Sequence, residues 1–144
     1  MYKEKGINFE ILKKVLDQFL EKSIFLIFIA HGIAHLVGFF IYWKLMAGTT
    51  DTPYSTKIFF SQIDIGIVGV SLLGFIYLVL AVLFVSFGIL LIIKKIPFND
   101  VKILVLILFS LVITIINLMP TIIGLIVNIV YLSVYLMNKK LNLI

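Results

Sequence analysis

Residues 23–43 read SIFLIFIAHGIAHLVGFFIYW, and this stretch contains no Asp, Glu, Lys or Arg. A helix rises by about 1.5 Å per residue, so a helix of this length can cross the roughly 30 Å hydrocarbon core of a bilayer. Tyr42 and Trp43 end the stretch, as aromatic residues commonly do at a membrane interface. The stretch therefore predicts a transmembrane helix.

The rest of the chain has the same apolar character. Of its 144 residues, 62% are hydrophobic and only 13% are charged, and the mean hydropathy is +1.23. Soluble domains are about 45–50% apolar and about 25% charged. A single domain of this size cannot bury such an excess of apolar surface, so we expect an integral membrane protein whose first partner is the lipid bilayer.

Two further apolar regions follow. A polar stretch, residues 44–62, predicts a loop, and residues 63–93 predict a second span long enough to tilt or protrude. Residues 101–137 are too long for one span. Pro120 suits the first turn of a new helix and disfavours helix at the residue before it. We therefore predict two helices, at about 101–118 and 120–137, joined by a tight turn; one proline-kinked helix is the alternative.

The distribution of lysine favours four spans. All twelve basic residues are lysine. Four spans place ten of them on the cytoplasmic side: Lys3, Lys5, Lys13, Lys14, Lys22, Lys94, Lys95, Lys102, Lys139 and Lys140. Only Lys44 and Lys57 then lie outside, as the positive-inside rule requires. We expect a multi-pass protein of the cell (plasma) membrane with both termini in the cytoplasm and no nucleic-acid partner.

Residues 1–22 have a different pattern from the spans. Leu12, Leu16 and Phe19 fall on one helical face, and most charged residues lie elsewhere, which is typical of an interfacial helix. The predicted organisation is an N-terminal amphipathic segment, 1–22, followed by a transmembrane domain, 23–144. The predicted fold class is all-α, an integral membrane four-helix bundle.

His31 and His35 are the first candidate functional residues. They are four residues apart, so they lie about 40° apart on one face of the helix, near the middle of the span. Ionisable residues at that depth are costly and usually point into the protein. Ala30, Ala34 and Gly38 form a neighbouring stripe of small residues, which predicts the close approach of another helix.

Polar residues on the other spans can face this pair. Ser71, Ser110, Thr114 and Asn128 complete the predicted ligand-binding or polar core set, and Asn117 is a further candidate. The plainest interpretation is that these residues hydrogen-bond to neutral histidines and hold the helices together. The alternatives are a ligand or metal site and proton handling.

The predicted metal ligands are His31 and His35, because histidines at i and i+4 can bind one ion. No carboxylate lies at a matching depth, so a homodimer would have to bring four histidines together. Haem would also need a dimer, or one axial histidine alone. Thiolate metal sites are excluded because the chain has no cysteine. No cofactor is firmly predicted.

The segment His31-Gly32-Ile33-Ala34-His35-Leu36-Val37-Gly38-Phe39 resembles the HGxxHLxGF pattern of small, largely uncharacterised four-helix membrane proteins of bacteria and archaea. The resemblance covers the first span well and the rest only in layout. It implies a four-span bundle with the histidine pair on the first helix, and no established activity. A looser similarity, in helix number and size, is to the DoxX-type four-helix proteins.

Three functions fit these features. The first is a non-enzymatic accessory or binding subunit, alone or in a larger membrane complex, with a small His-lined polar site. The second is a metal- or haem-binding redox protein, and the third is an oligomeric unit for permeation of small solutes or ions. The sequence shows no nucleophile–base pair, phosphate loop or paired carboxylates, so an enzyme is disfavoured.

Overall fold

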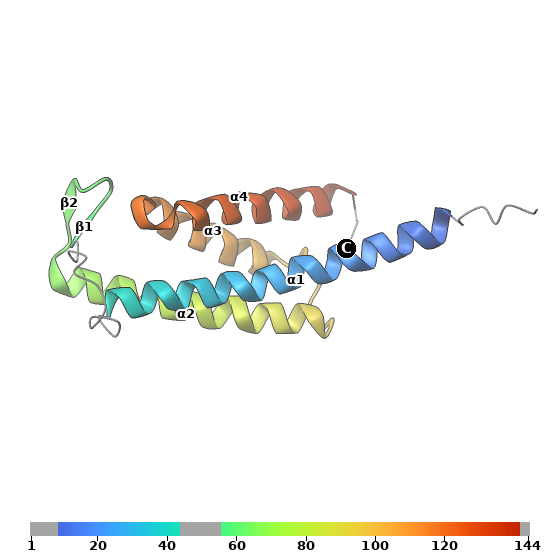
Figure 1. The fold of residues 1–144 in the computed structure, drawn as a ribbon, viewed down its shortest axis with the longest axis horizontal. Coiled ribbons are helices and arrows are strands. Elements are labelled where there is room, and N and C mark those ends of the chain that lie inside the picture. The colour runs from blue at the N-terminus through green and yellow to red at the C-terminus, as the bar shows by residue number, and fades with distance from the viewer. Residues whose placement is uncertain (1–8, 44–55, 142–144) are drawn as a thin grey trace, which may run out of the picture.

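The structure, a computed structural model, describes residues 9–43 and 56–141. Within these ranges the chain forms four helices and one small hairpin (Figure 1). The elements, in chain order, are α1 (Phe9–Tyr42), β1 (Lys57–Ile58), β2 (Ile63–Asp64), α2 (Gly66–Ile92), α3 (Val101–Ile116) and α4 (Leu118–Leu141). The predicted all-helical class is confirmed, and the four helices correspond to the four apolar stretches of the sequence, without a separate N-terminal helix.

Helix α1 runs without interruption through Lys22, where the sequence analysis places the end of a separate N-terminal helix. Residues 9–30 contain neither glycine nor proline, so nothing in the local sequence breaks the helix there. The first part of α1 extends past the ends of the other helices (Figure 1). The predicted amphipathic face of residues 1–22 lies outside the described side chains, apart from Lys22.

Helix α2 begins three residues later than the predicted span. Ile63 and Asp64 pair antiparallel with Ile58 and Lys57, and the carboxylate Oδ1 of Asp64 accepts a hydrogen bond from the backbone N–H of Gly66 at 2.9 Å. Gly66 has a φ of 62°, a left-handed conformation that glycine adopts without steric cost. The hairpin was not predicted, and most of the predicted loop, residues 44–55, lies outside the described residues.

Helices α3 and α4 form the predicted hairpin. The Asp100 carboxylate caps α3 by accepting a hydrogen bond from the backbone N–H of Lys102 at 2.8 Å. Asn117 alone separates the two helices, which lie side by side and run in opposite directions (Figure 1). This arrangement excludes the single kinked helix. Helix α3 ends two residues before its predicted end, and α4 continues to Leu141.

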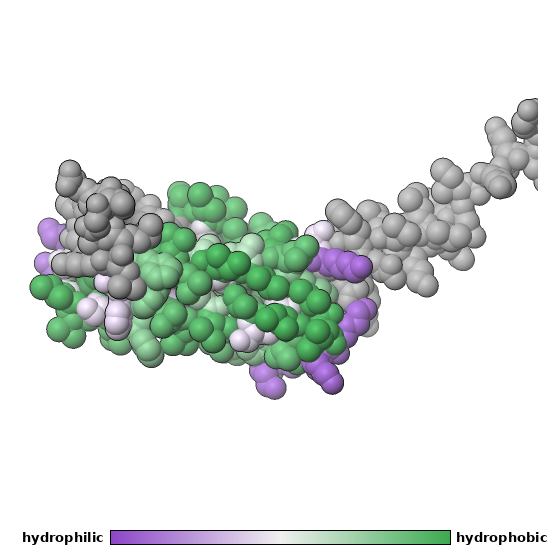
Figure 2. Space-filling model, turned by 60° about the horizontal axis from the view of Figure 1, so that its bottom comes forward, coloured by the Kyte–Doolittle hydropathy of each residue, from purple (hydrophilic) through white to green (hydrophobic). Residues whose placement is uncertain are grey.

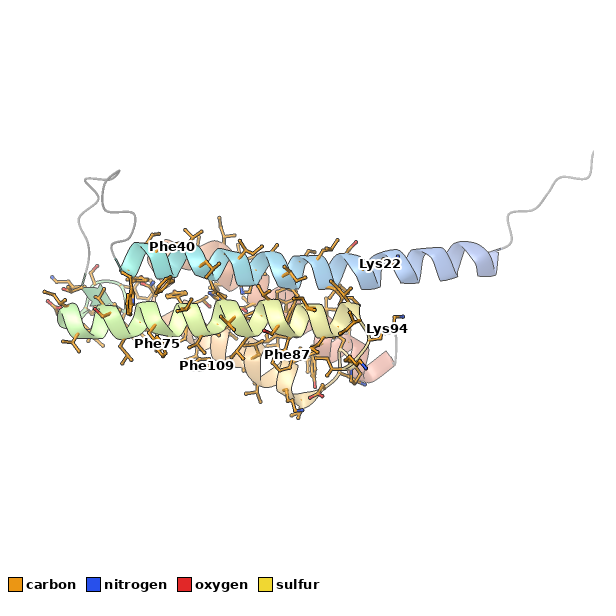
Figure 3. The ribbon with its side chains drawn as sticks, turned by 90° about the horizontal axis from the view of Figure 1, so that it is seen from below. Lys22, Phe40, Phe75, Phe87, Lys94 and Phe109 are labelled. Atoms are coloured by element: carbon orange, nitrogen blue, oxygen red, sulfur yellow. The ribbon has the colours of Figure 1, made fainter. Side chains whose placement is uncertain are left out.

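The four helices form two layers, with α1 against α2 and α3 against α4 (Figures 1 and 3). Gly32 lets α1 approach α2 closely, because a Cβ there would lie 3.0 Å from the backbone nitrogen of Val85. The predicted small-residue stripe behaves differently. Gly38 does pack against Tyr77 of α2, but Ala30 and Ala34 are exposed. Close contact between α1 and α2 therefore occurs at Gly32. The predicted close approach of another helix at Ala30 and Ala34 was wrong.

On the face that Figure 2 shows, apolar side chains cover the middle of the molecule, and polar ones gather at its ends. Among the described residues, two helical segments are long and apolar enough to cross a membrane, Lys22–Tyr42 and Gly66–Ile92. The apolar parts of the other two helices, Val101–Ile116 and Ile122–Met137, are shorter. Many large apolar side chains are exposed, and Val68 and Ile123 are 83% and 75% exposed.

Candidate functional site

Five of the six predicted site residues come together in the middle of the molecule. His31 and His35 come from α1, Ser110 and Thr114 from α3, and Asn128 from α4. Each of these side chains is at most 6% exposed. They meet because each lies on the buried face of its own helix, between apolar residues such as Phe28 and Ile107.

The hydroxyl group of Ser110 is the centre of this cluster. Its Oγ lies 3.1 Å from Nε2 of His35 and 3.5 Å from Nε2 of His31. It also accepts a hydrogen bond from Nδ2 of Asn128 at 3.0 Å. One oxygen atom therefore joins side chains from three helices.

The hydrogen-bonding capacity of the Ser110 hydroxyl group limits which tautomers the two imidazoles can adopt. A hydroxyl group can donate one hydrogen bond and accept two, and the amide nitrogen of Asn128 can only donate. One acceptor position and one hydrogen then remain for two histidines. If both histidine contacts are hydrogen bonds, one Nε2 accepts the serine hydrogen and the other donates its own. The two neutral rings must then be opposite tautomers.

Thr114 extends the cluster along α3. Its Oγ1 donates to the carbonyl oxygen of Leu111 at 2.9 Å and accepts from Nδ2 of Asn128 at 3.4 Å. Within the described residues, two buried polar atoms make no hydrogen bond: Oδ1 of Asn128 and the hydroxyl oxygen of Tyr131. Such groups are costly in a low-dielectric interior.

Aromatic rings enclose the histidines. The ring of His31 meets that of Phe84 edge-on, with centroids 4.8 Å apart, and lies 5.7 Å from that of Tyr131. The centroid of His35 lies 5.5 Å from that of Tyr77 and 4.6 Å from that of His31. These rings pack against both imidazoles and restrict their orientation.

A second polar group lies towards the hairpin end. Nδ2 of Asn117 donates to the hydroxyl oxygens of Tyr42 and Tyr77, the latter at 3.3 Å. The two tyrosine rings stack with centroids 5.5 Å apart. Asn117 was among the residues considered from the sequence as a polar partner, whereas neither tyrosine was. A tyrosine in an apolar span needs a partner for its hydroxyl group, and this signal was present at Tyr77.

Ser71, the sixth predicted residue, does not join the cluster. Its side chain is exposed, and its backbone carbonyl oxygen accepts a hydrogen bond from Nε1 of Trp43 at 2.9 Å. The buried face of α2 runs through Val70, Leu73 and Tyr77, which turns Ser71 outward.

A cavity of about 520 Å³ lies beside the histidines, between α1 and α4. Polar residues on one side of it include His31, His35, Thr114 and Asn117, and Tyr42 and Tyr77 also line it. The remaining walls are apolar, with Ile27, Ala30, Ala34, Val37, Gly38 and Ile41 from α1 and Ile123, Gly124 and Val127 from α4. Three members of the cluster, His31, His35 and Thr114, thus line the cavity, whereas Ser110 and Asn128 do not.

The described residues contain no group of three or more His, Asp or Glu side chains that could share a metal ion. Asp64 lies in the hairpin and is exposed, away from the histidines. The predicted pair therefore offers two ligands, and both Nε2 atoms already contact Ser110.

Comparisons with protein-family models, with curated proteins and with solved structures give no match.

Proposed function

We propose that the chain is a multi-pass membrane protein, a four-helix bundle in which all four helices span the bilayer. The support is the apolar belt between two polar ends (Figure 2). Lys22 and Lys94 lie at the same end of the molecule (Figure 3), and this is also where α1 starts and α4 ends (Figure 1). Under the positive-inside rule this end is cytoplasmic, and so are both termini.

The N-terminal part of α1 belongs to the cytoplasmic side in this proposal. Because α1 has no break at Lys22, the amphipathic segment reaches the membrane surface as a direct continuation of the first span. The lysine at its membrane end, Lys22, would contact anionic head groups, while the residues before it project into the cytoplasm.

The proposed activity is that of a non-enzymatic accessory or binding subunit with a small intramembrane polar site. One observation carries it: five polar side chains from three helices meet beside a cavity. Each interhelical hydrogen bond contributes about 1 kcal/mol in a membrane protein, so the cluster also stabilises the bundle. Stabilisation alone does not require a chamber next to the histidines, whereas binding does.

The experiment has two steps. In the first, membranes containing the protein are washed with alkaline carbonate, which removes peripheral proteins; the protein is expected to remain in the pellet. In the second, the purified wild type is compared with a His31→Ala/His35→Ala variant by elemental analysis and by mass spectrometry of extracted small molecules. An organic molecule present in the wild type and depleted in the variant supports a binding subunit.

The same measurement separates the alternatives. Stoichiometric iron, copper or zinc that disappears in the double variant would replace the proposal with a metal- or haem-binding redox protein. Release of the protein by carbonate would contradict the proposal entirely. Within the described residues, no observation specifically supports a metal- or haem-binding redox protein or an oligomeric permeation unit.

A further inference from the structure

We propose that the cavity between α1 and α4 binds the hydroxyl head group of an uncharged membrane amphiphile, which enters sideways from the lipid. This inference rests on the proposed intramembrane site and names the class of ligand that the site takes.

The walls of the cavity set the route of entry. Ile27 and Val37 on α1 are each 51% exposed, and Ile123 on α4 is more exposed still, so the rim lies on the outer surface of the molecule. In a bilayer this surface faces acyl chains. A ligand that is itself dissolved in the membrane can therefore enter between the helices without crossing water.

The lining of the cavity sets the charge of the ligand. None of the described residues that line it is Lys, Asp or Glu, although lysines are frequent at the cytoplasmic end of the molecule. A phosphate or carboxylate head would be desolvated there without a fixed opposite charge, which is strongly unfavourable. An uncharged head avoids this cost.

The histidine pair sets the hydrogen-bonding character of the head. Both rings line the cavity, and both use Nε2 to contact Ser110, so a ligand that hydrogen-bonds to these rings would do so at Nδ1. Opposite tautomers present one Nδ1 donor and one Nδ1 acceptor. A hydroxyl group, which both donates and accepts, satisfies both rings; an ether satisfies only the donor.

Gly124 leaves space in the cavity beside Thr114 and His31. A Cβ at this position would lie 3.3 Å from Cγ2 of Thr114 and 4.0 Å from Cε1 of His31. The hydrogen of glycine leaves that space for a ligand atom. The volume of about 520 Å³ is in the range of small-molecule sites, which suits a head group with the first part of its chain.

The test uses three photoreactive probes with the same alkyl chain, added to the full-length protein in liposomes. The probes are hexadecanol, its methyl ether and hexadecanoate, each carrying a diazirine next to the head group. Crosslinked residues are identified by mass spectrometry of peptides. We expect the alcohol to label residues 27–41 of α1 and 122–127 of α4 roughly fivefold more than the ether, the factor that one hydrogen bond supplies.

Two matched variants locate the labelling. Ala34→Phe fills the cavity from its rim and leaves every residue of the Ser110 cluster in place. Ile33→Phe adds an aromatic ring one position away, at an exposed residue that does not line the cavity. Labelling by the alcohol is expected to fall severalfold in Ala34→Phe and to stay at the wild-type level in Ile33→Phe.

Equal labelling by the alcohol and the ether, preferred labelling by hexadecanoate, or unchanged labelling in Ala34→Phe would overturn the inference. The alkaline wash distinguishes this failure from that of the proposed function. A protein that stays in the membrane but shows no preference for the alcohol retains the proposed function and loses only the ligand class.

Discussion

The hydroxyl oxygen of Ser110 on α3 lies 3.1 Å from Nε2 of His35 on α1, and this contact joins residues 75 positions apart in the chain. It connects the two layers of the molecule at the place where α4 also contributes Asn128. Hydrogen bonds between helices fix which faces meet, whereas apolar packing in lipid specifies them less strictly. Ser110 therefore helps to determine which faces of α1, α3 and α4 meet.

The first prediction concerns Ser110. Ser110→Ala removes the shared hydroxyl and leaves two imidazole nitrogens and one amide group without it. We expect a loss of about 2–3 kcal/mol in the free energy of unfolding, from three contacts at about 1 kcal/mol each. Unfolding in mixed detergent micelles measures it. Ser71→Ala is the matched control, with almost no effect because that side chain is exposed; equal losses in the two variants would contradict the cluster.

The sequence was sufficient to predict four helices, because long apolar runs and the breaks at Lys94 and Pro120 are local features. It also indicated which side of α1 is buried, because intramembrane histidines rarely face lipid. It could not place Ser71. Helix α2 is apolar on all sides, so no polar face shows which way it points until its partners are known.

The cavity and the hairpin were beyond sequence reasoning for other reasons. The cavity depends on the distance between α1 and α4, which no local sequence pattern encodes. Small residues such as Ala30 and Ala34 are compatible with a cavity and equally with close packing of another helix. The strands of the hairpin have only two residues each, too few for an alternating pattern.

The second prediction concerns close packing at Gly32. In Gly32→Ala the new Cβ would lie 2.9 Å from Cβ of Phe84 and 3.0 Å from the backbone nitrogen of Val85, so α2 must move away from α1. We expect a loss of about 1–3 kcal/mol in unfolding free energy. In Gly124→Ala, the control, the nearest atom is the methyl group of Thr114, and the loss is expected to be smaller. A larger loss of unfolding free energy in Gly124→Ala than in Gly32→Ala would show that α1 and α2 are less tightly packed.

The third prediction compares two tyrosines on α4. The hydroxyl of Tyr131 is buried and has no hydrogen bond within the described residues, whereas that of Tyr135 donates to the carbonyl oxygen of Asn99 at 3.0 Å. Tyr131→Phe is expected to leave stability unchanged or to raise it by up to about 1 kcal/mol. Tyr135→Phe is expected to lower it by about 1 kcal/mol. Thermal unfolding of both variants provides the measurement, and a loss at Tyr131 alone would reveal a partner for its hydroxyl.

The fourth prediction concerns pH at the start of α2. Hydrogen bonds from Thr56 and from the backbone N–H of Gly66 hold the pKa of the Asp64 carboxyl below its ordinary value. A lowered folded-state pKa means that this stabilisation is complete above the ordinary aspartate pKa and is lost as the pH falls through the lowered value. Protection of the Gly66 amide from hydrogen exchange, corrected for intrinsic rates, should decrease only at that acidic end, and Asp64→Asn should remove the dependence. If the midpoint of this pH dependence lay at or above the ordinary pKa of aspartate, the result would be inconsistent with the hydrogen bonds to the Asp64 carboxylate.

If all four helices span the bilayer, the Ser110 cluster lies inside it, and labelling of single cysteines from each side of the membrane measures this topology. The chain has no cysteine, so single-cysteine variants need no background removal. In intact cells, a membrane-impermeant maleimide is expected to label Gln62→Cys, between the strands of the hairpin. Asn99→Cys, between α2 and α3, should react only after the membrane is opened, and Ser110→Cys only after the protein is unfolded. Labelling of positions 62 and 99 from the same side, or of position 110 in the folded protein, would show that the four helices do not span the bilayer around Ser110.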